Sequence, residues 1–348
     1  MCAYALVCVR LEKCMNIVVL AGGLSMERDV SLTSGSLIAN ALSECGNKTV
    51  LVDLYFGIKK EDMTFAGEQK RYSYKIPEVA PDLELIKAQN GGREDPIGEG
   101  VVEFCKMADV TFLALHGGVG ENGNLQALLE MNGIRFTGSS SVGCTLSMDK
   151  IISKQLVLAS GVPTAEWLTA KDDAKRLEEM VPCFVKPADN GSSVGITKVT
   201  DKAYLADAIS EARKYSDKVL VERQVRGREF SVGVLDGEAL PPIEIIADGE
   251  FYDYKIKYQA GLAREVCPAE LTAEETLKLG EYAKRAHEAL CLGSYSRIDF
   301  ILDESGEFYF LEANALPGMT PTSLLPQEAK AAGFSYEKLC MKIIELSK

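Results

Sequence analysis

Histidine and tryptophan are the scarcest residues of this 348-residue sequence, with two copies and one copy. With so few histidines and no C-x-x-C pair, a structural zinc site is not expected. The ten cysteines are scattered, so we interpret them as small buried residues of a protein from a reducing compartment, the cytoplasm. The net charge is −13 and no Lys/Arg run occurs, so nucleic acid is not an expected partner.

Long apolar stretches are also missing. No segment approaches the roughly 20 apolar residues of a membrane-spanning helix, so no membrane partner is expected. Residues 1–14 (MCAYALVCVRLEKC) have a short apolar run but neither a basic start nor a small-residue cleavage site, so they do not resemble a signal peptide. We expect residues 1–14 to be a disordered extension ahead of Met15.

The rest of the chain is long enough for two or three domains, and 47% of all residues are apolar. Residues 15–138 predict a Rossmann-like open α/β domain, because strands and helices alternate there. Its predicted elements are strands at 16–21, 49–54 and 109–115 and a helix at 28–43. Residues 57–100 are rich in Gly, Pro and charge, and we expect them to be irregular.

Two further domains are predicted beyond this point, both of α+β type. Residues 139–226 form a small unit with helices at 148–160, 172–180 and 201–215 and strands at 166–169, 183–186, 196–199 and 218–222. Residues 227–348 are richer in strands, at 229–235, 239–246, 297–302 and 307–311. A helix at 273–290 opens with the capping-box spacing of Thr272 and Glu275. Residues 254–268 are expected to be a polar loop, and a loop of this length inside a domain is usually functional or mobile.

The first candidate for chemistry is Lys186 with the Gly/Ser loop at 190–195. A lysine at the end of an apolar strand favours an anionic partner, since burying an unpaired charge is costly. Glycines and hydroxyls in the loop can surround phosphate oxygens. The alternative is an ordinary hairpin turn with a lysine that reaches into solvent. The loop lacks the Gly-Lys-Ser/Thr of a Walker A motif.

The second candidate combines Arg297 and Asp299 on one strand with Glu312 and Asn314 on the next. Alternation along a strand places each pair on one face. If the two strands pair in antiparallel fashion, the carboxylates, the amide and the arginine converge. Such hard oxygen ligands suit Mg²⁺ held between protein and nucleotide phosphates. The alternative, a surface salt-bridge ladder, is disfavoured because the flanking residues are apolar.

Two weaker signals adjoin these segments. Gly318 follows a proline, and the turn can present backbone N–H groups to a developing oxyanion or can be a plain turn. Residues 221–225, with Glu222 and the later Glu229, lie where the central unit passes into the last one. This segment can hold an adenine and a ribose, or it can be an exposed charged hinge.

Residues 22–31 (GGLSMERDVS) pose a different alternative. A dinucleotide site here would place Asp53 on a ribose, but the G-x-G-x-x-G spacing is absent, so a nicotinamide dehydrogenase is disfavoured. Glu27 lies at a helix N-terminus instead, where the helix dipole favours a carboxylate.

Together these motifs resemble the D-alanine–D-alanine ligase family of the ATP-grasp fold. The matching stretches are Gly22–Ser34, LHGGVGENGNLQ (115–126), TGSS and SMDK within 137–150, VKPADNGSSVGITKV (185–199), FYDYKIKY (251–258), CPAEL (267–271), and RIDF and FLEANALPGMTPTSL within 297–325. The likeness runs from about residue 15 onward, apart from residues 57–100. It implies ATP and two Mg²⁺ ions, with Mn²⁺ as an alternative metal, D-alanine as substrate, and a homodimer.

The resemblance also implies roles for individual residues. The implied catalytic residues are Glu27, Ser192, Tyr258, Arg297 and Gly318. The implied substrate-binding residues are His116, Lys257, Ser323 and Leu324. The implied ATP-binding residues are Lys150, Lys186, Ser193, Glu222, Arg223, Val225 and Glu229. The implied metal ligands are Asp299, Glu312 and Asn314.

The reaction implied by the resemblance is ATP-dependent formation of D-alanyl phosphate, which the amine of a second D-alanine then attacks, for peptidoglycan precursors. Tyr258 favours an amine acceptor, whereas the following loop, QAGLAREV, leaves D-serine open. The chain departs from common members at Arg223-Gln224, Asn190 and Asn122. The alternatives are a D-alanyl-D-serine or D-alanyl-D-lactate ligase, another ATP-grasp carboxylate–amine ligase, and a non-catalytic nucleotide-binding module.

Overall fold

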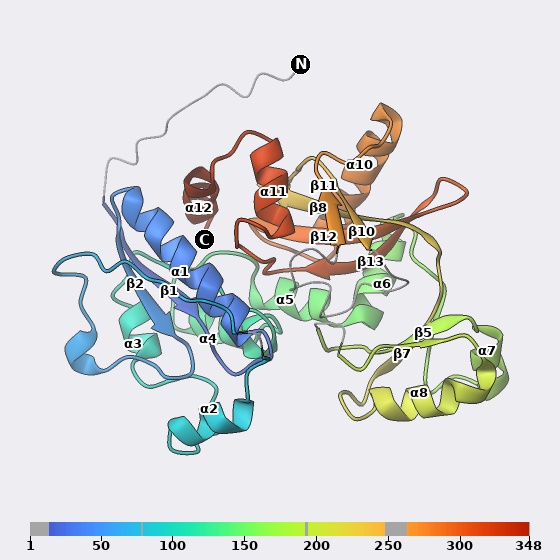
Figure 1. Cartoon of the computed structure of the whole chain (residues 1–348), viewed down its shortest axis with the longest axis horizontal. Coiled ribbons are helices and arrows are strands. Elements are labelled where there is room, and N and C mark those ends of the chain that lie inside the picture. Colours follow the sequence, from blue (N-terminus) through green and yellow to red (C-terminus); the bar gives the residue numbers. More distant parts are fainter. Residues whose placement is uncertain (1–13, 78, 192–193, 248–262, 348) are drawn as a thin grey trace.

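The computed structural model describes residues 14–77, 79–191, 194–247 and 263–347. The extension expected at 1–14 lies, apart from Cys14, outside these residues. Within them the chain forms three sheets; in Figure 1 the first lies at the left, and the third lies above the second at the right. The helix α5 (Ser141–Met148) leads from the first part of the chain to α6 (Lys150–Ala159), which lies between the second and third sheets. Among the described residues, no helix has the length and apolar character needed to cross a membrane.

The first sheet is parallel, with the order β2-β1-β3, and confirms the predicted βα alternation. Its strands are β1 (Asn16–Ala21), β2 (Lys48–Asp53) and β3 (Val110–Leu113), and α1 (Arg28–Glu44) connects the first two. Gly22 ends β1 at a φ of +74°, and a Cβ there would lie 2.5 Å from the Asp53 carboxylate. The turn between β1 and α1 therefore needs glycine both for its conformation and for the space.

Residues 57–100 are largely irregular, as predicted, with a single-turn 3-10 helix η1 (Lys60–Asp62) and α2 (Leu83–Gln89). They are nevertheless tied to α1. Asn40 exchanges two hydrogen bonds with the backbone of Tyr72, and the Tyr74 hydroxyl donates to Asp29 Oδ1 at 2.5 Å. The helices α3 (Val101–Cys105) and α4 (Asn124–Met131) follow.

The second sheet is antiparallel, with the order β4-β7-β5-β6. Its strands are β4 (Trp167–Thr169), β5 (Cys183–Pro187), β6 (Thr197–Val199) and β7 (Val219–Arg223). Its helices are α7 (Ala174–Glu179), η3 (Lys202–Tyr204) and α8 (Leu205–Ala212). The helix predicted from 148 begins at Lys150, because Asp149 caps it by accepting from the N–H groups of Ile151 and Ile152.

The third sheet has the order β11-β10-β8-β12-β13, with β9 paired to β8. Its strands are β8 (Gly227–Leu235), β9 (Glu238–Ala239), β10 (Ile243–Ala247), β11 (Ala263–Val266), β12 (Tyr295–Asp303) and β13 (Phe308–Asn314). The helix α10 (Ala273–Ala289) begins with the predicted capping box of Thr272 and Glu275.

Two predictions for this sheet are wrong in part. The single strand expected at 239–246 is two strands, because Pro241-Pro242 cannot donate to a ladder. The loop expected at 254–268 contains β11. A polar edge strand has little hydrophobic alternation, which explains why this strand was missed. Residues 254–262 lie outside the described part of the chain.

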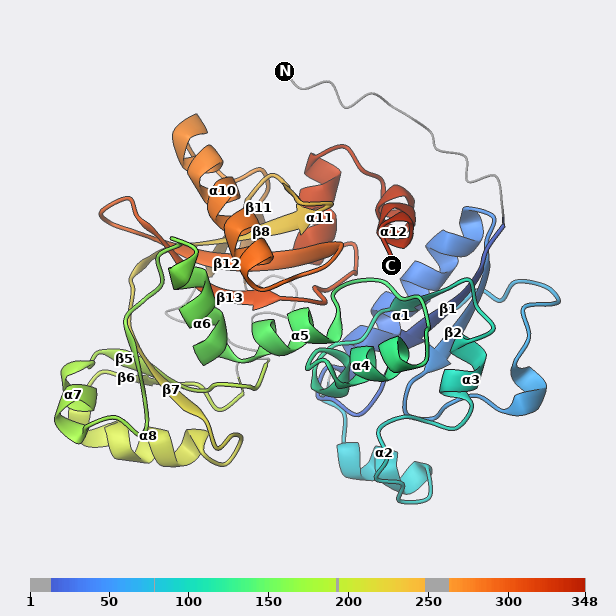
Figure 2. The ribbon, with the colours of Figure 1, turned by 180° about the vertical axis from the view of Figure 1, so that it is seen from behind.

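The helices α11 (Leu324–Ala331) and α12 (Tyr336–Glu345) lead from the third sheet back toward the first. Both views show α12 beside α1 (Figures 1 and 2). Leu339, Ile343 and Ile344 of α12 belong to the same apolar core as Ile38 and Leu42 of α1. Segments far apart in the sequence therefore share one core.

Candidate functional site

A cavity of about 830 Å³ is lined by strands of the second and third sheets and, from the first part of the chain, by α1 and by residues that follow β3. Every predicted site residue that the structure describes lines it. These residues are Glu27, His116, Lys150, Lys186, Glu222, Arg223, Val225, Glu229, Arg297, Asp299, Glu312, Asn314, Gly318, Ser323 and Leu324. The remaining predicted residues, Ser192, Ser193, Lys257 and Tyr258, lie outside the described part of the chain.

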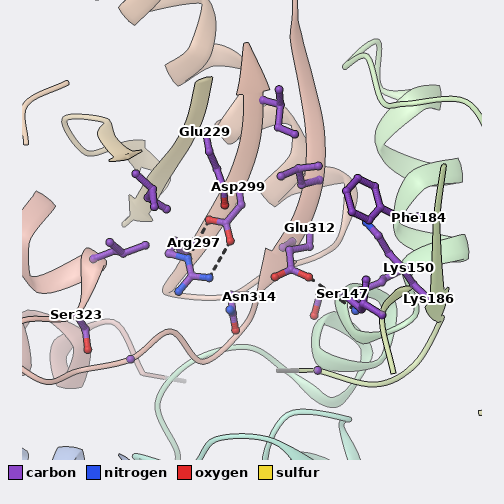
Figure 3. Close-up of a pocket in the computed structure, with 18 of the residues that line it drawn as sticks. Ser147, Lys150, Phe184, Lys186, Glu229, Arg297, Asp299, Glu312, Asn314 and Ser323 are labelled. Carbon is purple, nitrogen blue, oxygen red and sulfur yellow. Dashed lines mark hydrogen bonds and ion pairs between the residues drawn. The ribbon is translucent and has the colours of Figure 1, made fainter. Parts of the chain in front are cut away.

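The centre of the cavity is formed by β12 and β13, which pair in the predicted antiparallel fashion. Asp299 lies opposite Glu312 and Arg297 opposite Asn314, so all four converge. Arg297 donates Nε and Nη2 to the two oxygens of Asp299 at 2.9 and 2.8 Å (Figure 3). Both side chains are largely buried, so the alternative of a surface salt-bridge ladder is wrong.

A register shift follows Asp299, because Phe300 pairs with Phe310 and leaves Leu311 as an extra residue. A bulge of this kind changes the direction of neighbouring side chains. Here Leu311 and Glu312, although consecutive, both line the cavity. The apolar alternation predicts the two strands but gives no sign of this shift.

The side chains of Asp299, Glu312 and Asn314 offer two carboxylates and an amide oxygen on one wall. Ser231 also donates to Asp299 at 2.7 Å, which orients the carboxylate. The described residues contain no group of three or more His, Cys, Asp or Glu side chains placed to hold a metal. Two carboxylates and an amide nevertheless fit Mg²⁺, which commonly takes few protein ligands and completes its shell with phosphates and water.

One end of the cavity is rich in lysine. The Glu222 carboxylate is buried and accepts one ion pair on each oxygen, from Lys154 and from Lys186. Burial alone would raise the pKa of Glu222, but the two lysines outweigh it and lower the pKa to about 2. Glu222 is therefore not part of an exposed hinge, and Lys186 does not simply reach into solvent.

Lys154 was not predicted, although one signal in the sequence pointed to it. It lies one helical turn beyond Lys150, so both lysines share a face of α6. Lysine is almost never fully buried, and the sequence does not reveal that Glu222 of β7 is its partner. The side chain is fully buried, and it also bonds to Thr164 Oγ1 at 2.5 Å.

Lys150 connects this end with the centre. Its Nζ donates to the backbone oxygen of Asn190 at 2.8 Å. The same nitrogen lies 3.7 Å from Glu312 Oε2 (Figure 3). The guanidinium of Arg223, which also lines the cavity, pairs with Glu166 at 2.8 Å. Because its guanidinium is engaged by Glu166, Arg223 is better placed to contact a ligand through its backbone than through its side chain.

The opposite end of the cavity is acidic. Glu27 is buried at the start of α1, and His116 follows β3. His116 Nδ1 lies 3.8 Å from Glu121 Oε1. Burial raises the pKa of Glu121, His116 opposes the rise and Glu27 adds to it. Glu121 was not predicted, and neither was Ile76, which brings the segment 57–100 to the cavity wall.

Gly318 and Ser323 close the cavity beside Arg297. A Cβ on Gly318 would lie 2.7 Å from Ser323 Oγ, so only glycine leaves this hydroxyl in place. Ser323 Oγ accepts from Thr320 N at 3.1 Å, and Ser323 immediately precedes α11. A polar turn and the start of a helix therefore lie next to the arginine.

A missed residue lies behind this wall. Glu328 of α11 is fully buried, and its Oε1 accepts from Gly233 N at 3.0 Å. Its Oε2 has no hydrogen-bond partner among the residues that the structure describes. Burial raises the pKa of Glu328 well above its usual value, while Gly233 and Arg297 oppose the rise. Its position four residues beyond Leu324, on the buried face of the helix, was a signal in the sequence.

The dinucleotide alternative has no support in this geometry. Asp53 pairs with the buried guanidinium of Arg28, and it accepts the N–H groups of Tyr55 and Phe56 at 2.9 and 3.1 Å. Its oxygens are thus engaged within the protein.

Comparison with known proteins identifies relatives over nearly the whole chain. Two family models match, one described as D-ala D-ala ligase N-terminus over residues 16–139 and one as D-ala D-ala ligase C-terminus over residues 156–345. The first match runs through residues 57–100, which the sequence resemblance had left out. A D-alanine–D-alanine ligase of Pediococcus pentosaceus is 42% identical over 340 residues, covering 95% of this chain and 97% of the relative.

Solved structures show the same likeness. A D-alanine–D-alanine ligase from Bacillus anthracis, complexed with ATP, superposes with a TM-score of 0.74 at 30% identity, covering 96% of this chain and 97% of the other. The VanG D-Ala:D-Ser ligase from Enterococcus faecalis superposes with a TM-score of 0.75 at 29% identity, covering 96% of this chain and 99% of the other. The predicted ATP-grasp fold, with its Rossmann-like first part, is confirmed.

Proposed function

Because the chain belongs to the D-alanine–D-alanine ligase family, we propose that it joins two D-alanine molecules at the expense of ATP. The observation that carries the proposal is the order of charges along one cavity. A lysine-rich end, a pair of facing carboxylates with an arginine, and an acidic end follow one another. This order matches a triphosphate, its metals and an ammonium group.

The lysine-rich end is the proposed nucleotide site. Lys150 and Lys186 would bind the phosphates together with Ser193, while Glu222, Val225, Glu229 and the Arg223 backbone would hold adenine and ribose. Asp299, Glu312 and Asn314 would hold two Mg²⁺ ions, or Mn²⁺, which offset the charge of the transferred phosphoryl group. The register supports this role, because it places Glu312 opposite Asp299 and Asn314 opposite Arg297 on the cavity wall.

The acidic end is the proposed site of the first D-alanine. Glu27 would accept its ammonium group, and His116 would lie near its carboxylate. That carboxylate attacks the γ-phosphate and gives D-alanyl phosphate with release of ADP. Ser192 and Tyr258 would join Glu27 in a hydrogen-bonded set that ties the loop at 190–195 to the first domain. The loop at 254–268 would exclude water from the intermediate.

The second D-alanine would bind beside α11. Ser323, Leu324 and Lys257 would hold its carboxylate, and its amine attacks the acyl carbon and expels phosphate. Arg297 and the Gly318 N–H would stabilise the oxyanion, since donors fixed at a developing charge lower the barrier. We further propose that the enzyme supplies peptidoglycan precursors in the cytoplasm and acts as a homodimer.

The test is release of phosphate from Mg²⁺-ATP with D-alanine alone, with added D-serine, or with added D-lactate, and identification of products by mass. We expect D-alanyl-D-alanine from D-alanine alone. Product formation only with a second acceptor would replace the proposal by a variant ligase, a candidate that the likeness to the D-Ala:D-Ser ligase favours. Binding of ATP without turnover in any mixture would refute the enzymatic proposal.

A further inference from the structure

Two lysines share one buried carboxylate at the nucleotide end, and they are not equivalent. The Lys154 side chain is 0% exposed, whereas that of Lys186 is 13% exposed. Lys186 lines the cavity together with Glu222, and Lys154 lies behind Glu222 in α6. Only Lys186 can therefore reach a ligand.

Lys154 is held in place by further contacts. Its Nζ bonds to Thr164 Oγ1, and Thr164 in turn donates to the backbone oxygen of Phe310 at 2.9 Å. The Trp167 ring lies 5.3 Å from the same nitrogen, a cation–π distance. The second sheet, α6 and β13 thus fix this ammonium group, so it stays with Glu222 whatever the cavity contains.

We propose that Lys154 is a positioning residue, a permanent counter-ion of Glu222 that allows Lys186 to turn from Glu222 to the nucleotide phosphates. The inference rests on the proposed nucleotide site and adds to it. In the ligand-free protein Lys186 completes the neutralisation of Glu222 by binding its second oxygen. When phosphates arrive, Lys186 changes partner, and the pair of Glu222 with Lys154 remains neutral.

Without Lys154 this exchange becomes unfavourable. Lys186 would be the sole cation on a buried carboxylate, and moving it to the phosphates would leave Glu222 charged and unpaired. Breaking a buried ion pair by removing one partner is strongly destabilising. Lys186 would therefore stay with Glu222, and the contact with the phosphates would be lost while the base and ribose contacts persist.

The experiment is titration calorimetry of the purified full chain with the β,γ-imido analogue of ATP plus Mg²⁺, and in parallel with adenosine. For Lys154→Met we expect affinity for the triphosphate analogue to fall about tenfold or more, as for loss of a charged hydrogen bond. Affinity for adenosine should change by less than about threefold, since Glu222 keeps one lysine. Equal losses for both ligands would show a general collapse of the pocket and overturn the proposal.

A second pair of variants keeps the test decisive if Lys154→Met folds poorly. Glu222→Gln removes the carboxylate, so the double variant Lys154→Met/Glu222→Gln contains no unpaired buried charge. We expect these two variants to bind the triphosphate analogue equally, within about threefold, because Lys154 acts through Glu222. A further tenfold loss in the double variant would refute this route. Lys202→Met, an exposed lysine paired with Glu178, is the matched control.

The binding readout separates this inference from the proposed function. A wild-type protein that binds the analogue but makes no dipeptide would refute the ligase activity and leave the role of Lys154 fully testable. A ligase whose Lys154→Met variant binds the analogue as tightly as wild type would refute the role of Lys154 alone.

Discussion

The two ends of the cavity treat buried carboxylates in opposite ways. At the nucleotide end Glu222 is matched by two lysines, and its pKa falls to about 2. At the proposed amino-acid end Glu121 lies beside His116 and near Glu27. The pKa of Glu121 rises there because the carboxyl is buried and because Glu27 is negatively charged. The first end balances its carboxylate with two lysines, whereas at the second end burial and a neighbouring carboxylate raise the pKa of Glu121.

This difference indicates what each end gains from a ligand. A carboxylate that already has two counter-ions can release one lysine to an anion without becoming unpaired. A carboxylate such as Glu121, whose pKa is raised by burial and by a second carboxylate, is relieved when a cation arrives, because an opposite charge within a few ångströms favours the ionised form. This contrast supports the proposed assignment of the phosphates to the first end and of the ammonium group to the second.

The largest expected effect comes from Arg297, which lies between the two ends. Arg297→Met removes a proposed oxyanion donor and should lower kcat by about 10²–10³-fold. Burial would lower the pKa of Arg297, but Asp299 outweighs it and raises the pKa, so the guanidinium stays charged at every working pH. Steady-state kinetics measures the loss. Arg297→Lys keeps the charge but not the bidentate geometry, and equal activity of this variant and wild type would contradict the role.

The next effect separates the ends directly. Glu27→Gln should raise KM for D-alanine about 10–100-fold, as for loss of a hydrogen bond to a charged group, and leave affinity for the imido analogue of ATP unchanged. Glu44→Gln, at an exposed carboxylate, is the control. Weakened nucleotide binding in Glu27→Gln would show that the two ends are not independent.

A third prediction contrasts Glu222 with Glu328 through pH. The pKa of Glu328 is well above 4.5 in the folded protein, whereas the unfolded chain releases this proton near pH 4.5. The free energy of unfolding therefore decreases as the pH rises above 4.5, because the folded state must keep a proton that the unfolded state has lost. The Glu222 contribution has the opposite sign, being present above pH 4.5 and lost as pH falls through about 2. Glu328→Gln should therefore be more stable than wild type at pH 8 and lose that advantage at pH 5.

Denaturant unfolding at several pH values measures this contrast. The amide still accepts the N–H of Gly233, so the variant keeps the hydrogen bond that Oε1 makes. A difference between Glu328→Gln and wild type that is the same at pH 5 and pH 8 would contradict a proton held on Glu328.

The smallest effect concerns the segment 57–100. Tyr74→Phe removes the hydroxyl that donates to Asp29, a loss of about 1 kcal/mol, and should lower the melting temperature by roughly 2–4 °C. Burial raises the pKa of Tyr74 to about 12 with help from Asp29, so the bond persists throughout the neutral range. Because this segment brings Ile76 to the cavity, KM for D-alanine should rise slightly. Tyr204→Phe, at an exposed tyrosine, is the control.

Much of the fold could be predicted from the sequence because its signals are local. Apolar runs predict the strands on either side of α1, and the pair Thr272 and Glu275 predicts the start of α10. Alternation placed Arg297 with Asp299 and Glu312 with Asn314, and the antiparallel register brought them together. These signals depend on neighbouring residues alone.

The rest depends on partners far away in the sequence. Lys154 and Glu328 lie on helix faces whose surroundings are set by other elements, so their burial could not be deduced from their own segments. The bulge at Leu311 needs the opposite strand to exist. Ile76 lies at the cavity near Tyr74, whose hydroxyl is hydrogen-bonded to Asp29, a residue 45 positions away in the sequence.

The packing of α12 against α1 also has a consequence for biosynthesis. β3 ends at Leu113, whereas Leu339, Ile343 and Ile344 belong to the same core. A ribosome adding about 5–20 residues per second needs on the order of ten seconds or more to cover that stretch. During that time the first sheet has been translated, but part of its apolar surface stays exposed because α12 has not yet been made. The first sheet is therefore one of the first parts to be translated and one of the last to complete its core.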